Sequence, residues 1–154
     1  MYTHEHKINS PLDYNYITDG IFIGTNQCCK IGIAEVLKNE GIAADISLEE
    51  TQVDQPFGVE MYIWIPTPDH TSPTQDQLSF GVSTLTKLVS QKKKVYVHCK
   101  NGHGRASTLV AAYLISKGFT VEKAINLVRE KRPAMHLQDN QIDGLTTFIL
   151  TQKI

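Results

Sequence analysis

Hydrophobic residues recur along this chain with two periods, of about two residues in short segments and about 3.6 in longer ones. The short segments alternate or are β-branched, and this composition predicts β-strands. They are residues 16–24, 42–48, 59–65 and 95–97. Within the first segment, Asp19 and Gly20 form a dipeptide that favours a tight turn, so a hairpin-like pair of strands is expected there.

Segments with the longer period predict helices, and several begin or end at residues with capping chemistry. Gly41 is a plausible C-terminal cap, and Ser72 with Pro73 and Gln75 is typical of a helix start. Thr120 is expected to cap a later helix. The expected helices cover residues 28–40, a segment starting after Ser72, a segment from 106 to 117, residues 121–132, and a final segment that carries Ile142, Leu145 and Ile149.

Because strands and helices alternate, the sequence predicts an α/β domain with three layers. A central, mainly parallel sheet of four to five strands is expected, flanked by helices. Residues 1–15 are polar and contain Pro11, which indicates a flexible lead-in. Residues 16–154 are expected to form a single domain, since about 150 residues suffice for one hydrophobic core.

Composition narrows the classes of partner. The 154 residues are 41% hydrophobic and carry a formal net charge of −1, so no strong positive field is available to attract nucleic acid. The first residues lack an apolar leader segment, and no apolar run is long enough for membrane insertion. Three cysteines do not indicate a disulfide framework, and a reducing cytoplasm and a monomer are expected.

The remaining cysteines and histidines raise two smaller questions. Cys28 and Cys29 are adjacent, which is the spacing of neither a metal pair nor a redox C-x-x-C motif. We expect at least one of them to be a buried core residue. The alternative is that one forms a disulfide with the third cysteine, Cys99, after that residue has been oxidised. His4 and His6 could bind a metal, but no further ligands accompany them in the sequence.

The segment 95–107 (VYVHCKNGHGRAS) carries the clearest chemistry. A β-branched strand leads into a loop with Gly102 and Gly104, and an apolar helical pattern follows Arg105. Backbone N–H groups in such a loop, at the N-terminus of a helix, bind anions. Cys99 opens the loop, and Arg105 closes it with a planar fork of donors that matches two phosphoryl oxygens. Such surroundings favour a thiolate at neutral pH, placed to attack phosphorus in line.

This Cys-x5-Arg segment after a hydrophobic strand, preceded by His98, resembles the signature of the cysteine-dependent protein tyrosine and dual-specificity phosphatases. The resemblance implies that Cys99 is the nucleophile, that His98 orients the loop from behind, and that neither a metal nor another cofactor is needed. The implied phosphate-binding residues are Lys100, Asn101, Gly102, His103, Gly104 and Arg105. A buried structural cysteine with a solvated arginine, and a rhodanese-like sulfur-transfer loop, are the alternatives.

A proline-rich loop, residues 65–74, follows the strand 59–65. Asp69 is its only acidic residue, and a proline-stiffened loop after a strand can hold a carboxyl group over a neighbouring site. A turn-forming aspartate is the alternative. In the family that the chain resembles, an aspartate in a similar loop protonates the leaving-group oxygen, so the resemblance implies that Asp69 is the general acid. Asp76 is the second candidate for the general acid, although it should lie one turn inside the next helix. His70 is expected to be a loop residue.

The C-terminal part resembles compact dual-specificity phosphatases, where a glutamine or asparagine can face the catalytic loop and place the hydrolytic water. Gln141 fits this role best, and Gln138 is the second candidate for it. The chain departs from the family after the arginine, where a serine or threonine is usual and Ala106 stands here. Ser107 follows, but neighbouring side chains on a helix point about 100° apart, so it does not simply substitute.

The resemblance implies a phosphomonoesterase that works through a cysteinyl-phosphate. Phosphotyrosine in proteins is the expected substrate, with phosphoserine and phosphothreonine as further substrates. A phosphoinositide or another small phosphorylated molecule is the alternative, because Lys100 and His103 add basic groups to the loop. A catalytically weak phosphate-binding module is the third alternative. Phosphate, sulfate or vanadate should occupy the site.

Overall fold

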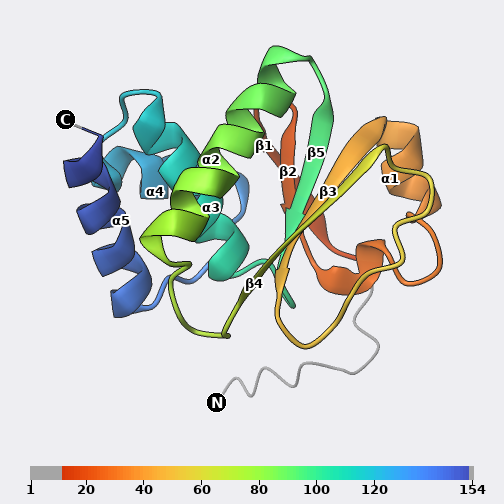
Figure 1. The fold of residues 1–154 in the computed structure, drawn as a ribbon, viewed down its shortest axis with the longest axis horizontal. Helices are drawn as coiled ribbons and strands as arrows, with labels where there is room; N and C mark the ends of the chain where they lie inside the picture. Colours follow the sequence, from red (N-terminus) through yellow and green to blue (C-terminus); the bar gives the residue numbers. More distant parts are fainter. Residues whose placement is uncertain (1–11, 153–154) are drawn as a thin grey trace.

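The computed structural model describes residues 12–152, and within them one five-stranded sheet has the strand order β1-β2-β5-β3-β4 (Figure 1). The strands are β1 (Tyr14–Thr18), β2 (Ile21–Gly24), β3 (Ile42–Glu49), β4 (Met61–Thr67) and β5 (Lys94–His98). The pairs β2–β5, β5–β3 and β3–β4 are parallel, and β1–β2 is antiparallel. The predicted, mainly parallel sheet is therefore confirmed.

The N-terminal hairpin forms around the predicted turn. Asp19 and Gly20 have φ angles of 55° and 83°, the left-handed pair that a two-residue hairpin turn requires. The Tyr113 hydroxyl donates to Oδ2 of Asp19 at 2.7 Å and so ties the turn to the helix behind it. Strand β1 begins at Tyr14, two residues before the expected boundary at residue 16. His4, His6 and Pro11 lie outside the described residues.

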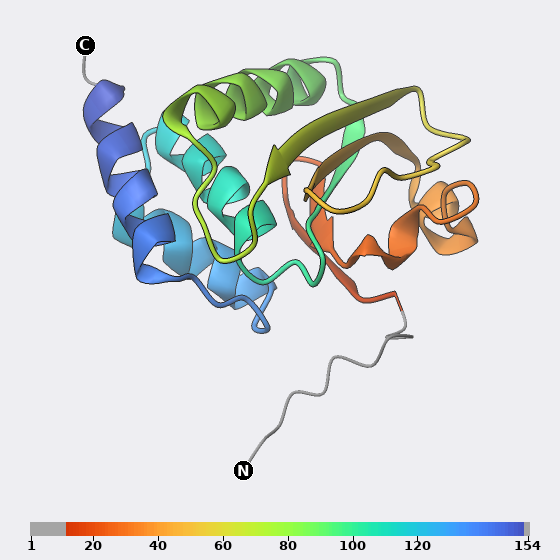
Figure 2. The same cartoon turned by 60° about the horizontal axis from the view of Figure 1, so that its bottom comes forward.

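Helices cover both faces of the sheet and give the predicted three layers (Figures 1 and 2). Four helices lie on one side, namely α2 (Gln75–Ser90), α3 (Arg105–Ser116), α4 (Val121–Lys131) and α5 (Asp139–Thr151). The short helix α1 (Glu35–Glu40) and the 3-10 helix η1 (Asn26–Cys28) lie on the other side. Helix α3 is buried along nearly its whole length, because it packs against α2, α4 and α5 as well as the sheet.

Side-chain alternation along the strands divides the core between these two faces. Val95 and Val97 of β5 belong to the large cluster under α2–α5, whereas Tyr96 belongs to the smaller cluster under α1. In β3, Ala44 and Ile46 likewise face the large cluster. Since successive side chains of a strand point to opposite faces, the polar residues between them lie on the α1 side. This alternation brings Asp45 and His98 to the same face.

The expected helix 28–40 is wrong in its first part. Helix α1 begins only at Glu35, because the preceding backbone bonds to another loop instead of to itself. The N–H of Gly32 donates to the Gln55 carbonyl at 2.7 Å, and the N–H of Ile33 donates to the Phe57 carbonyl at 2.9 Å. Gly41 ends α1 in the left-handed conformation, as predicted.

The predicted N-cap of α2 is also corrected, from Ser72 to Thr74. The Thr74 hydroxyl accepts the Gln77 N–H, and the Gln77 side chain accepts the Thr74 N–H, a reciprocal capping box. Ser72 instead donates its own N–H to Oδ1 of Asn140 at 2.9 Å and so joins this loop to α5. Asp76 is the second residue of α2, nearer the helix start than the expected position one turn inside it. Over the described part of the chain, no helix combines the length and apolarity needed to cross a membrane.

Candidate active site

The loop between β5 and α3 carries the Cys-x5-Arg segment at the carboxyl ends of the parallel strands. Cys99 is buried at its start, and Arg105 is the first residue of α3. Gly102 has a φ of 66°, and a Cβ there would come within 2.6 Å of the Gly24 carbonyl oxygen. Only glycine fits this approach. The loop is therefore folded tightly against the end of β2, ahead of the N-terminus of a buried helix.

The Arg105 guanidinium is buried and held from two strands. Its Nη1 donates to the Thr67 carbonyl at 2.9 Å and to the Leu48 carbonyl at 3.4 Å. Its Nη2 lies 3.4 Å from Oδ1 of Asp69 and 3.8 Å from Oε2 of Glu49. The Nε atom has no hydrogen-bond partner among the described residues. The Nη1 end of the guanidinium is therefore fixed by hydrogen bonds, whereas the N–H of Nε can still donate to a bound ligand.

The structure brings Asp69 to this guanidinium from the loop after β4. Its side chain is 56% exposed, and Oδ1 also accepts the His70 N–H at 2.9 Å. His70 has a left-handed φ of 62° and lies 3.6 Å from the same carboxylate. The proline-rich loop therefore holds one carboxyl group at the boundary between solvent and the buried arginine.

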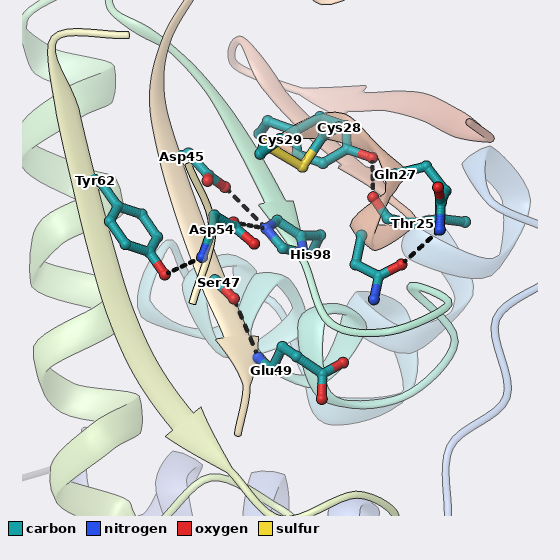
Figure 3. The surroundings of a disulfide bond; sticks show 12 residues. Thr25, Gln27, Cys28, Cys29, Asp45, Ser47, Glu49, Asp54, Tyr62 and His98 are labelled. Carbon is teal, nitrogen blue, oxygen red and sulfur yellow. Dashed lines mark hydrogen bonds and ion pairs between the residues drawn. A yellow bond between two sulfur atoms is a disulfide. The ribbon is translucent and has the colours of Figure 1, made fainter. Parts of the chain in front are cut away.

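His98 lies behind the loop, on the α1 face of the sheet. Its Nδ1 lies 3.1 Å from the Cys99 carbonyl oxygen, and its Nε2 faces Oδ2 of Asp54 at 2.6 Å and Oδ1 of Asp45 at 3.0 Å (Figure 3). Burial alone would lower the pKa of His98, but the two carboxylates more than offset it and raise the pKa to about 10. An imidazolium with Nδ1–H donated to the Cys99 carbonyl anchors the loop from below.

The two carboxylates beside His98 differ in environment. Burial raises the pKa of Asp45 to about 7, and the nearby imidazolium offsets only part of that effect. Burial also acts to raise the pKa of Asp54, but the hydrogen bond with His98 prevails and the pKa is lowered. The Asp54 backbone N–H donates to the Tyr62 hydroxyl oxygen at 3.2 Å, which fixes this loop to β4.

Arg132, at the C-terminal end of α4, is a second buried arginine at the loop. Its Nε donates to the Gly102 carbonyl and its Nη2 to the Asn101 carbonyl, both at 2.9 Å. Its Nη1 donates to Oδ1 of Asn15 at 2.8 Å, and Nη2 lies 3.4 Å from Oδ2 of Asp13. One guanidinium therefore joins the loop between β5 and α3 to strand β1 and helix α4.

Residues of α3 and α5 surround the rest of the loop. The Gln141 amide is buried against Gly104, because a Cβ at residue 104 would come within 2.8 Å of its Nε2. That Nε2 donates to the Thr71 carbonyl at 3.2 Å. The second candidate, Gln138, is instead the N-cap of α5. The Ser107 hydroxyl donates to the Gly102 carbonyl at 3.2 Å, and the Thr108 hydroxyl donates to the Gly104 carbonyl at 2.8 Å.

The expectation for the adjacent cysteines needs a correction. Cys28 and Cys29 are joined by a disulfide bond, which the odd number of cysteines did not indicate (Figure 3). Both side chains are buried in the cluster under α1, so the expected place in the core is confirmed. Cys99 is the free thiol.

Sequence reasoning missed four residues of this region: Asp45, Glu49, Asp54 and Arg132. Three of them carried a signal that could have been used. Asp45 and Glu49 interrupt or end an apolar strand, and Arg132 precedes a proline at a helix end. Charged residues in apolar surroundings are seldom fully buried unless they are paired, so they indicate partners elsewhere in the chain. Asp54, in an irregular loop, carried no such signal.

Comparison with known proteins agrees with this geometry. The family model described as "Dual specificity phosphatase, catalytic domain" matches residues 21–149. The human "Phosphatidylglycerophosphatase and protein-tyrosine phosphatase 1" is 35% identical over 115 residues, which are 73% of this chain and 57% of that protein. The Arabidopsis thaliana "Phosphatidylglycerophosphate phosphatase PTPMT2" is 33% identical over 114 residues, 68% of this chain and 50% of that protein. The chain therefore spans about half the length of these curated relatives.

Solved structures share the fold at lower sequence identity. Human DUSP28 superposes with a TM-score of 0.81 at 20% identity, over 90% of this chain and 97% of that one. The crystal structure of PTPMT1 superposes with a TM-score of 0.77 at 24% identity, over 92% and 96% of the two chains. Since the family model matches most of its length, this chain belongs to the dual-specificity phosphatase catalytic-domain family.

Proposed function

We propose that the chain hydrolyses phosphate monoesters through a cysteinyl-phosphate intermediate. The Cys99 sulfur attacks phosphorus in line while the Asp69 carboxyl gives its proton to the departing oxygen. Asp69, now a carboxylate, then takes a proton from the water that attacks the intermediate. That attack releases inorganic phosphate and regenerates the Cys99 thiolate. Arg105 and the backbone N–H groups of the loop stabilise the equatorial oxygens in both steps.

The observation that carries this proposal is the arrangement of the Arg105 guanidinium. Burying a charged group is costly unless its hydrogen-bonding capacity is used. Nη1 is satisfied by two strand carbonyls, whereas the buried Nε has no partner within the described chain. Two phosphoryl oxygens in the loop would accept one hydrogen bond each from Nε and Nη2, the bidentate geometry that arginine favours.

The position of Asp69 fits the role of acid and base. Its carboxylate lies 3.4 Å from Nη2 of Arg105, where the negative charge is stabilised. A bound phosphoryl group would share this guanidinium, so the Asp69 carboxyl would lie beside the reacting phosphate. The Gln141 amide, between Gly104 and the Thr71 carbonyl, is within the same loop assembly and is the proposed aid in placing water.

For the substrate, we favour a phosphomonoester on a glycerol phospholipid. Two of the curated relatives are named phosphatidylglycerophosphatases or phosphatidylglycerophosphate phosphatases. Such a lipid carries a phosphodiester near its terminal phosphate, and the exposed Lys100 in the loop offers a second cation for it. Phosphotyrosine in proteins, the expectation from the sequence, is the second candidate, because the name of the human relative includes protein-tyrosine phosphatase.

A panel of substrates tests both the proposed phosphatase activity and the proposed preference for a phospholipid. Phosphatidylglycerophosphate in mixed vesicles, a phosphoinositide and a phosphotyrosine peptide are compared by kcat/KM, with a chelator present and at two salt concentrations. We expect the first substrate to exceed the peptide by at least about tenfold, with a decrease at high salt because exposed charges are screened. A peptide turned over equally well would favour a protein phosphatase. No turnover of any of the three, nor of an aryl phosphate, would overturn the proposed activity.

A further inference from the structure

Five side chains with metal-binding atoms meet behind the catalytic loop, on the α1 face of the sheet (Figure 3). They are Cys28, Cys29, Asp45, Asp54 and His98, and their ligand atoms all lie within 4.8 Å of one another. The residues come from η1 and the segment after it, from β3, from the loop before β4, and from β5. None of them contacts the phosphoryl group in the proposed reaction, so the cluster needs another explanation.

The histidine has the hydrogen bonding of a metal ligand. Nδ1 of His98 lies 3.1 Å from the Cys99 carbonyl, and because a carbonyl only accepts, Nδ1 must carry a hydrogen. Nε2 is then the nitrogen that faces the cluster, 2.6 Å from Asp54 and 3.0 Å from Asp45. Histidines that bind metals commonly donate their other N–H to a backbone carbonyl or carboxylate, which fixes the ring.

Asp45 supplies an independent observation. Its side chain is fully buried, and within the described residues neither carboxylate oxygen has a hydrogen-bond partner. The hydrogen on Nε2 of His98 goes to the nearer Asp54, which leaves Asp45 with an ion pair at 3.0 Å and no donor. A buried carboxylate without donors is costly. A cation held between Asp45, Asp54 and His98 would remove that cost.

We propose that the reduced protein binds one zinc ion in this cluster, through Nε2 of His98, the carboxylates of Asp45 and Asp54, and a thiolate of Cys28 or Cys29. Sulfur, imidazole nitrogen and carboxylate oxygen together form a ligand set for zinc, whereas magnesium and calcium prefer oxygen alone. Tetrahedral bonds of about 2.0–2.2 Å separate nitrogen and oxygen ligands by about 3.3–3.6 Å. The present separations of 2.6 and 3.0 Å therefore need only a small outward movement.

Reduction must come before zinc, because the two sulfur atoms are joined in this structure. A water-soluble phosphine breaks the S–S bond, becomes its oxide with oxygen from water, and leaves two thiols. Zinc then displaces one proton from the ligating thiol and one from Nε2 of His98. With both carboxylates ionised, a dication enters as two protons leave, so the net charge of the buried cluster is unchanged.

Zinc in this cluster would stabilise the fold around the loop and would take no part in the phosphatase reaction. His98 directly precedes Cys99 and holds its carbonyl, so a zinc-bound ring would fix the start of the phosphate-binding loop from behind. The proposal stands independently of the proposed phosphatase activity, because its readouts are metal content, thiolate ligation and thermal stability.

The test uses the full chain with Cys99→Ser, which removes the free thiol as a competing ligand, together with His4→Ala and His6→Ala, which remove the N-terminal histidines as competing ligands. After phosphine reduction without oxygen, zinc is titrated against a chromophoric chelator, and cobalt is titrated by absorption. We expect one zinc per chain, a rise in Tm, and a thiolate-to-cobalt charge-transfer band. All three should be absent when the disulfide is kept intact.

Substitutions then assign the ligands. Asp45→Asn should weaken zinc binding by at least about tenfold, whereas Asp76→Asn, the same change at an exposed position, should not. The Cys28→Ser, Cys29→Ser double variant should lose the charge-transfer band even if zinc still binds weakly. Absence of stoichiometric zinc in the reduced protein would overturn the proposal. So would zinc binding that is unchanged by both Asp45→Asn and the double cysteine variant.

Discussion

Replacing Arg132 with methionine should both destabilise the protein and impair catalysis. Methionine keeps an unbranched apolar stem of similar length, so the change isolates the guanidinium. Three short hydrogen bonds are lost, to the carbonyls of Gly102 and Asn101 and to the side chain of Asn15. Removing one partner from a buried, charge-assisted set costs about 3–5 kcal/mol, because the remaining polar groups stay buried without a donor. For a chain of this size that corresponds to a fall in Tm of roughly 6–20 °C.

The substitution should also impair catalysis in the fraction of the protein that remains folded. The two loop carbonyls belong to residues between Cys99 and Arg105, so the loss of their donor lets the phosphate-binding loop move. A displacement of about 1 Å at a reacting centre can cost about a hundredfold in rate. We expect kcat/KM on an aryl phosphate to fall by that order, at a temperature where the variant is still folded by circular dichroism.

Leu88→Ala provides the matched control for this experiment. Leu88 is buried near the C-terminal end of α2, and its truncation should cost a comparable 2–5 kcal/mol or so by leaving a cavity. Both variants are compared at equal fraction folded. If Arg132→Met loses no more kcat/KM than Leu88→Ala, or if its Tm equals that of the wild type, the role assigned to the guanidinium is refuted.

Three further predictions concern the reaction itself. Cys99→Ser should abolish turnover while vanadate binding persists, because Arg105 and the loop amides remain; turnover above a few per cent would contradict the nucleophile. Asp69→Asn should reduce kcat far more on phosphotyrosine than on an ester of an acidic phenol, since only a basic leaving group needs the proton; equal losses on both would point to another acid. Ala106→Ser should raise kcat about ten- to a hundredfold without changing the rate of a pre-steady-state burst, because a hydrogen bond to the departing sulfur is worth about 1.5–3 kcal/mol. Wild-type turnover without a burst would argue against that last prediction.

The structure strengthens the reasoning about Ala106. Each neighbouring hydroxyl has one hydrogen, and the Ser107 and Thr108 hydroxyls already donate theirs to the carbonyls of Gly102 and Gly104. Neither therefore has a hydrogen left for the Cys99 sulfur. The sequence predicted the missing hydroxyl at residue 106 but not the partners of its neighbours.

The sequence correctly predicted the turns and strands that depend mainly on neighbouring residues in the chain. Asp19 and Gly20 carry their turn preference wherever they stand, and the β-branched run 95–97 needs only burial to form a strand. The fold class therefore followed from the sequence. The boundary at residue 28 did not, because the amides of Gly32 and Ile33 are used by carbonyls more than 20 residues away. Helical periodicity does not report such a competing loop.

The residues missed at the site share a long-range origin. Arg132 meets Asn15 across 117 positions, and His98 meets Asp54 across 44. A pattern of neighbours along the chain cannot show which distant groups satisfy a buried charge. The proposed phosphate loop was visible because a single continuous segment carries it, whereas its supports are assembled from strands, a loop and a helix end.

Strand β4 has a consequence for solubility. Within residues 12–152 it is the last strand of the sheet and pairs with β3 alone, so its other edge has no partner strand there. Such edges promote aggregation unless the sequence interrupts them. Pro66, near the end of β4, is exposed and has no N–H to offer to an incoming strand. The proline-rich segment that carries Asp69 thus begins with a residue that discourages edge-to-edge association of copies, and a Pro66→Val chain should self-associate at lower concentration.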